Sequence, residues 1–74
     1  MEQIISEIIQ KINPFDNFDA DTDLLGEGIL DSLSLMVFIE EIEQKLGISI
    51  PEEKVNLESF YSIKSIIQLI NTLR

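Results

Sequence analysis

The sequence predicts a small all-α protein, a four-helix bundle with three main helices and one short helix around a single core. Three segments repeat apolar residues at the spacing of one helix face, and no segment alternates apolar and polar residues as a strand does. Apolar residues make up 45% of the 74 residues. A chain of this length has room for one domain, so residues 1–74 are expected to fold as a single unit. Without cysteine to form disulfides, helix packing has to stabilise it.

The first predicted helix covers residues 2–12. Asn13-Pro14 ends it, because the residue before a proline is disfavoured in the α region. Residues 13–31 then show no regular pattern, and connections of this length are often functional. One helix face is formed by Ile4, Ile5, Ile8, Ile9 and Ile12. We expect six apolar residues to pin the loop onto the helices: Phe15, Phe18, Leu24, Leu25, Ile29 and Leu30.

The second predicted helix covers residues 32–46, and Gly47 suits the left-handed position that follows a helix. Residues 49–53 predict a turn, with one helical turn begun by Pro51. The core face of this helix comprises Leu35, Phe38, Ile39, Ile42 and Leu46.

The remaining chain predicts the short helix and the last main helix. Asn56 is expected to cap the short helix, which runs through Phe60, and Ser62 to cap the final helix. Ile63, Ile66, Ile67, Ile70 and Leu73 form the core face of that final helix.

Composition excludes several classes of function. The chain has no histidine and no cysteine, so the common Ser-His and Cys-His catalytic pairs cannot form. Its net charge of −9 repels nucleic acids and anionic membranes and attracts basic protein surfaces. No signal peptide is recognisable, and no stretch approaches the roughly 20 apolar residues of a membrane span. We therefore expect a cytoplasmic monomer that does not insert into membranes.

Acidic residues gather in the long loop at Asp19, Asp21 and Asp23. Their spacing matches the first ligands of an EF-hand calcium loop. That loop also needs a central glycine and a closing bidentate glutamate, where this chain has Leu24 and Leu30. An EF-hand is therefore excluded, and the segment is predicted to be a solvated acidic loop, with a weak divalent-ion site left as the alternative.

The junction between this loop and the second helix carries the residues Gly28-Ile29-Leu30-Asp31-Ser32-Leu33. Ser32 falls at the helix N-terminus, where free N–H groups and the helix dipole favour an attached phosphate. Asp31 beside it suits a metal ion while a phosphoryl group is transferred. The alternative is that Asp31 or Ser32 is an N-cap. The tripeptide Asp-Ser-Leu does not decide between these by itself.

Over essentially its whole length the sequence resembles the acyl carrier protein family, in which Asp-Ser-Leu opens the second helix. The matching pieces are the isoleucine-striped first helix, Leu24-Leu25-Gly26, Asp31-Ser32-Leu33, residues 47–53 and Ser62-Ile63. The resemblance implies an acyl-carrier-protein-like fold and a non-catalytic carrier. It also implies that a phosphopantetheinyl transferase, using Mg²⁺, attaches 4′-phosphopantetheine from coenzyme A to Ser32. An adenylating or acyl-activating enzyme would then load the thiol of the arm, and an acyl- or aminoacyl-transferase would unload it.

Three apolar residues of the second helix, Leu33, Met36 and Val37, lie away from its core face. With Glu40 they predict a docking surface for partner enzymes, in which acids steer basic partners to an apolar anchor. The alternative is that the long loop covers them, and we expect such a cover for Leu33.

The class of carrier is indicated by departures from the fatty-acid type, which has Gly-Ala or Gly-Val before Asp-Ser-Leu. Here Ile29-Leu30 precede the motif, and residues 56–60 include an aromatic. Both features are similar to D-alanyl carriers and stand-alone aminoacyl or peptidyl carriers. We expect this class first and a fatty-acid or other dedicated acyl carrier second. An acidic helical interaction module without a cofactor is the alternative from another class.

Overall fold

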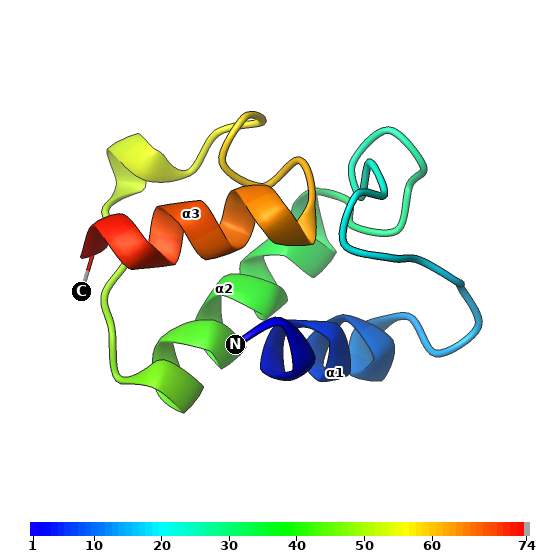
Figure 1. The fold of residues 1–74 in the computed structure, drawn as a ribbon, viewed down its shortest axis with the longest axis horizontal. Coiled ribbons are helices and arrows are strands. Elements are labelled where there is room, and N and C mark those ends of the chain that lie inside the picture. The colour runs from blue at the N-terminus through cyan, green and yellow to red at the C-terminus, as the bar shows by residue number, and fades with distance from the viewer. Residues whose placement is uncertain (74) are drawn as a thin grey trace.

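The computed structural model describes residues 1–73, and over that range the chain forms three α-helices and one 3-10 turn without any strand. The helices are α1 (Glu2–Ile12), α2 (Ser32–Leu46) and α3 (Ile63–Leu73), and the 3-10 turn is η1 (Glu52–Lys54). α1 packs against both α2 and α3 (Figure 1). The all-α class and the three main helices are confirmed. The four-helix bundle is not, because the predicted fourth helix is missing from the described residues.

The segment predicted as a short helix makes a single turn. The Phe60 N–H donates to the Asn56 carbonyl at 3.3 Å, and the Asn56 side chain accepts from the Ser59 N–H at 2.8 Å. Asn56 therefore caps a turn as predicted, but the prediction of a helix is wrong. Residues 55–58 are exposed, so they have no apolar face whose burial would offset the cost of ordering further turns. The single helical turn expected after Pro51 is present as η1.

The core is formed by one stripe from each helix and by apolar residues of the connecting segments. The two aromatic rings in it, Phe38 and Phe60, are fully buried and meet edge to face, with centroids 6.4 Å apart. The centres of the three predicted helix faces are buried, and their flanking residues are partly buried. The buried apolar residues are Ile5, Ile8, Ile9, Leu24, Ile29, Leu30, Phe38, Ile42, Ile50, Phe60, Ile63, Ile66, Leu69 and Ile70.

Gly47 ends α2 in the left-handed conformation, with φ +64°, as the sequence predicts. The Ile48 N–H returns to the Glu43 carbonyl at 3.3 Å, which is the long hydrogen bond of a Schellman motif. The helix therefore stops here, and the chain turns back toward η1.

The long loop between α1 and α2 is held by core anchors and by hydrogen bonds to neighbouring segments. Leu24, Ile29 and Leu30 are buried, and Phe18 and Leu25 are partly buried. Phe15 was expected to pin the loop onto the helices, but this is wrong, because 94% of its surface is exposed to solvent. It lies in a turn directly after α1, where the loop swings away from the helices before returning to α2 (Figure 1).

Several hydrogen bonds fix the path of this loop. The Asn13 side-chain amide donates to the Ile29 carbonyl and so joins the two ends of the loop. The Leu24 N–H donates to the Tyr61 carbonyl at 2.8 Å, and the Lys64 N–H donates to the Ala20 carbonyl at 3.2 Å. The loop is therefore tied to the start of α3, and its far end delivers the chain to Ser32 in a defined direction.

Candidate functional site

Ser32 is the first residue of α2, and it is exposed. The two residues before Asp31, Ile29 and Leu30, are 3% and 1% exposed. They anchor the end of the loop in the core, so the serine stands at a fixed point on the surface. The N-terminus of a helix carries backbone donors and partial positive charge, which suit an attached phosphate. The position of Ser32 thus fits a phosphodiester at its hydroxyl.

Asp31 is the N-cap of α2. Its backbone is extended, and its Oδ1 accepts a hydrogen bond from the Ser34 N–H at 2.9 Å. This bond lowers the pKa of the Asp31 carboxyl below its usual value of 3.8. The capping role that the sequence left open therefore belongs to Asp31, and it leaves the Ser32 hydroxyl available. An ionised carboxylate next to a phosphate raises the local negative charge, which a divalent cation would offset.

The predicted docking residues share one exposed face of α2. Leu33 is 81% exposed, Met36 66% and Val37 48%, and Glu40 is also exposed. At 100° per residue these four positions span an arc of about 100°, opposite the core face. The loop does not cover Leu33, so that expectation is wrong. Leu30 fixes the end of the loop on the core side of the helix, whereas Leu33 points the other way.

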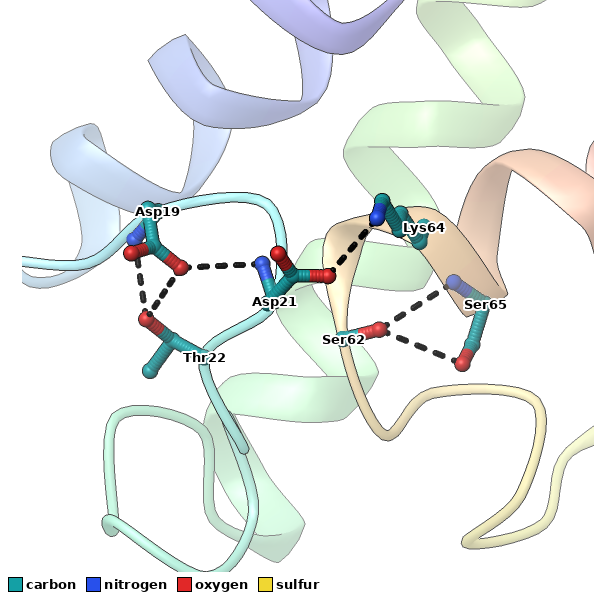
Figure 2. Close-up of polar contacts among 6 residues, drawn as sticks. All are labelled: Asp19, Asp21, Thr22, Ser62, Lys64 and Ser65. Carbon is teal, nitrogen blue, oxygen red and sulfur yellow. Dashed lines mark hydrogen bonds and ion pairs between the residues drawn. The ribbon is translucent and has the colours of Figure 1, made fainter.

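The acidic loop residues are engaged in local contacts (Figure 2). The Asp19 carboxylate accepts from the Asp21 N–H at 2.9 Å and from the Thr22 hydroxyl at 3.1 Å. Asp21 pairs with Lys64 at 2.9 Å, and Asp23 accepts from the Gly26 N–H at 2.7 Å. Within residues 1–73 no group of three or more potential ligands is placed to hold a metal ion. These acids shape the loop and fasten it to α3.

Ser62 caps α3, as the sequence predicts. Its hydroxyl oxygen accepts a hydrogen bond from the Ser65 N–H at 3.2 Å (Figure 2). The side chain is buried at 5% exposure, and this bond satisfies it. The cap stands directly beside the Lys64–Asp21 pair, so the start of α3 is where the acidic loop is fastened.

A groove beside α2 is the feature that sequence reasoning missed. It has a volume of about 530 Å³, and residues from α2 and from the segment around η1 line it. Of the lining residues only Met36 and Glu40 were predicted as functional. The signal available in the sequence was the recurrence of Met36, Ile39 and Glu43 on the same helix stripe as Ser32. The lining residues are Met36, Ile39, Glu40, Glu43, Ile50, Glu52 and Val55.

No helix in the described part of the chain is long and apolar enough to cross a membrane.

Comparison with known proteins connects this geometry to a family. The phosphopantetheine attachment site family matches residues 2–73. The D-alanyl carrier protein of Lactococcus lactis subsp. cremoris (strain MG1363) is 37% identical over 68 residues, covering 89% of this chain and 86% of the relative. The D-alanyl carrier protein of Enterococcus faecalis (strain ATCC 700802 / V583) is 32% identical over 76 residues, covering 100% of this chain and 97% of the relative. The resemblance to D-alanyl carriers is confirmed.

A solved structure is also similar. The chain matches, with 37% identity and a TM-score of 0.80, a chain in a crystal structure described as that of an FAD-dependent dehydrogenase. The match covers 92% of this chain and 99% of that chain, so the two chains are of similar length. Since the family match spans every residue of the three helices, the protein belongs to the phosphopantetheine attachment site family, whose members carry a covalent 4′-phosphopantetheine.

Proposed function

We propose that this protein carries D-alanine, or a related aminoacyl group, as a thioester on 4′-phosphopantetheine attached to the Ser32 hydroxyl. The observation that carries the proposal is the placement of Ser32, exposed on the first residue of α2 behind an Asp31 cap. The chain has no cysteine, and the bound arm supplies the thiol that a thioester needs. The backbone donors at the start of α2 hold the phosphate, and the chain itself performs no catalysis.

The partners follow from this chemistry. A phosphopantetheinyl transferase attaches the arm from coenzyme A, with Mg²⁺ and the Asp31 carboxylate at the site of transfer. An adenylating enzyme activates the amino acid and loads the thiol, and an aminoacyl-transferase removes it. The exposed Leu33, Met36 and Val37, with Glu40 at their edge, form the surface that these enzymes contact. We place the protein in the cytoplasm, where coenzyme A and ATP are available, and we expect it to be a monomer.

The first experiment measures the intact mass of the protein after incubation with coenzyme A, Mg²⁺ and a broad-specificity phosphopantetheinyl transferase. The wild type and Ser34→Ala should each gain one phosphopantetheinyl group, and Ser32→Ala should gain none. Ser34 is the matched control, because it lies two residues further along the same helix. A wild type that gains no mass, or a Ser32→Ala variant that does, would contradict the proposal and favour a cofactor-free interaction module.

The cargo is tested on the protein that carries the arm. With ATP and a D-alanine-activating adenylating enzyme, the mass should rise by one alanyl group, which neutral hydroxylamine then releases as expected of a thioester. Loading by a fatty-acyl-activating enzyme, with no loading of D-alanine, would instead support the dedicated acyl carrier.

A second candidate function rests on the matched chain in the FAD-dependent dehydrogenase structure, which is as similar in sequence as the Lactococcus carrier. As the second candidate, we infer that this protein presents a thioester-linked group to a flavoprotein that oxidises it. The carried group would lose two hydrogen atoms, and FAD would be reduced to FADH₂. Mixing the loaded protein with the dehydrogenase of that structure should then bleach the absorbance of oxidised flavin, whereas the Ser32→Ala variant should leave it unchanged.

A further inference from the structure

The chain segment that leads into α2 is held in place from two sides. From the side of α3, the Leu24 N–H donates to the Tyr61 carbonyl at 2.8 Å, and the Leu24 carbonyl accepts from the Leu30 N–H at 3.0 Å. From the side of α1, the Asn13 side-chain amide donates to the Ile29 carbonyl. Both neighbouring helices therefore fix the two residues that precede the N-cap of α2.

The tie from α1 differs from the other because a side chain makes it. Ile29 is 3% exposed and lies outside the helices, so its carbonyl needs a partner other than a helical one. Asn13 supplies this partner with its amide, while its backbone N–H donates to the Ile9 carbonyl at 2.8 Å. Substitution of Asn13 therefore removes the tie and keeps the backbone contact that ends α1. Pro14 still disfavours the α region at position 13.

Ser32 depends on this segment more than the docking residues of α2 do. The N–H groups of the first helical turn have no acceptor within the helix, and the Asp31 carboxylate satisfies that of Ser34. Displacement of the preceding segment would move Asp31, loosen this cap and let Ser32 change direction. Met36 and Val37 lie one turn further on, where hydrogen bonds of the helix hold the backbone.

We propose that Asn13 is a positioning residue for the attachment of phosphopantetheine. Its amide fixes the segment before α2 and thereby the direction of the Ser32 hydroxyl. The inference rests on the proposed function, and it adds a residue of α1's C-terminal end to the machinery of attachment. The docking residues Met36 and Val37 govern binding of the transferase, whereas Asn13 affects the chemical step.

The chemistry of that step explains why direction matters. The Ser32 oxygen forms a bond to the phosphorus that bears pantetheine, and the phosphoanhydride bond of coenzyme A breaks. Adenosine bisphosphate leaves, and the hydroxyl proton passes to a base of the transferase. The attacking oxygen has to lie in line with the bond that breaks, and a misplacement of about 1 Å costs about 100-fold in rate.

Steady-state kinetics of the transferase test the proposal, with intact mass as the measure of transfer. Asn13→Ala should lower kcat about tenfold, as expected for a displacement of less than about 1 Å. The KM for the carrier should stay within about twofold of the wild type. Asn13→Gln keeps the amide donor on a longer side chain and should recover part of the rate. If Asn13→Ala does not fold, Asn13→Asp replaces it in this comparison, because it keeps the size of the side chain and removes the donor.

Two controls separate positioning from a general loss of stability. Asn17→Ala changes an exposed asparagine of the same loop and should transfer at the wild-type rate. Ile70→Val trims a fully buried side chain of α3, at a cost in stability comparable to that of one hydrogen bond. It should leave kcat unchanged, because the segment before α2 keeps its ties.

NMR of the isotope-labelled protein shows where the structure responds. Asn13→Ala should shift the backbone amides of residues 30–34 and leave those of Met36 and Val37 in place. A kcat for Asn13→Ala within about twofold of the wild type, or an equal fall in Ile70→Val, would overturn the positioning role and leave the carrier function intact. A raised KM with unchanged kcat would also overturn it. Absence of any mass gain in the wild type would overturn the proposed function itself.

Discussion

The Asp31 carboxylate accepts a hydrogen bond from the Ser34 N–H at 2.9 Å, across the residue proposed to carry the arm. One side chain thus starts α2 and also places a negative charge next to Ser32. Capping needs a hydrogen-bond acceptor, whereas binding a cation needs the charge. The two roles are therefore separable by substitution.

Two substitutions of Asp31 should separate its effect on the stability of the protein from its effect on the rate of phosphopantetheine attachment. Asp31→Ala removes the cap and should lower the free energy of unfolding by about 1 kcal/mol. Asp31→Asn keeps an acceptor and should stay within about 0.5 kcal/mol of the wild type, yet it should slow attachment of phosphopantetheine because the charge is lost. Urea denaturation measures the first effect, and the initial rate of mass gain at fixed Mg²⁺ measures the second. Equal transfer rates for Asp31→Asn and the wild type would restrict Asp31 to capping.

Acid should destabilise the protein through the same carboxylate. Its hydrogen bond to Ser34 lowers the pKa of Asp31 below 3.8 in the folded state. The unfolded chain therefore binds a proton more readily, so this contribution is complete above about pH 3.8 and is lost as pH falls through the lower folded pKa. Thermal unfolding from pH 5 to pH 2 should show this loss, with a shallower pH dependence in Asp31→Asn. The pKa of Asp19, which its contacts with Asp21 and Thr22 also lower, should leave a residual slope in that variant.

Two leucines that lie nine positions apart in the sequence, Leu24 and Leu33, should differ in how much their truncation to alanine destabilises the protein. Leu24 is fully buried, and Leu24→Ala should lower the free energy of unfolding by about 2–5 kcal/mol. Leu33 is 81% exposed, and Leu33→Ala should change the free energy of unfolding by less than about 0.5 kcal/mol. The second variant should nevertheless raise the KM of the transferase for the carrier. If Leu33→Ala unfolds the protein or leaves that KM unchanged, Leu33 is not a docking residue.

Moderate salt should stabilise the protein. The net charge is −9, and the resulting repulsion is screened over about 10 Å at 0.1 M ionic strength. The ion pairs Lys11–Glu41 and Lys64–Asp21 are screened as well, but exposed pairs contribute little. The melting temperature should therefore rise between 10 and 150 mM NaCl, within the range over which the screening length changes. A flat or falling melting temperature would show that repulsion does not limit stability.

Periodicity predicted the main helices because each carries its own pattern. The isoleucine stripes of α1 and α3, the cap at Ser62 and the left-handed Gly47 are local features, and the structure contains each of them. Phe15 and residues 56–60 were predicted wrongly for a common reason. An apolar residue tends to be buried, and a capping asparagine tends to start a helix. Whether either tendency is realised depends on which surfaces the rest of the chain brings near.

The sequence by itself determined the helical class, the resemblance to phosphopantetheine carriers and the residue, Ser32, proposed to bear the arm. These depend on local spacing and on a motif whose parts are adjacent in the chain. Tertiary structure decided that Asp31 rather than Ser32 is the cap and that Leu33 is exposed. It also decided that Ile50, Glu52 and Val55 line one groove together with residues of α2. The physical reason is distance along the chain. The residues that line the groove precede and follow Gly47 in the sequence, and only packing of the whole chain brings them together.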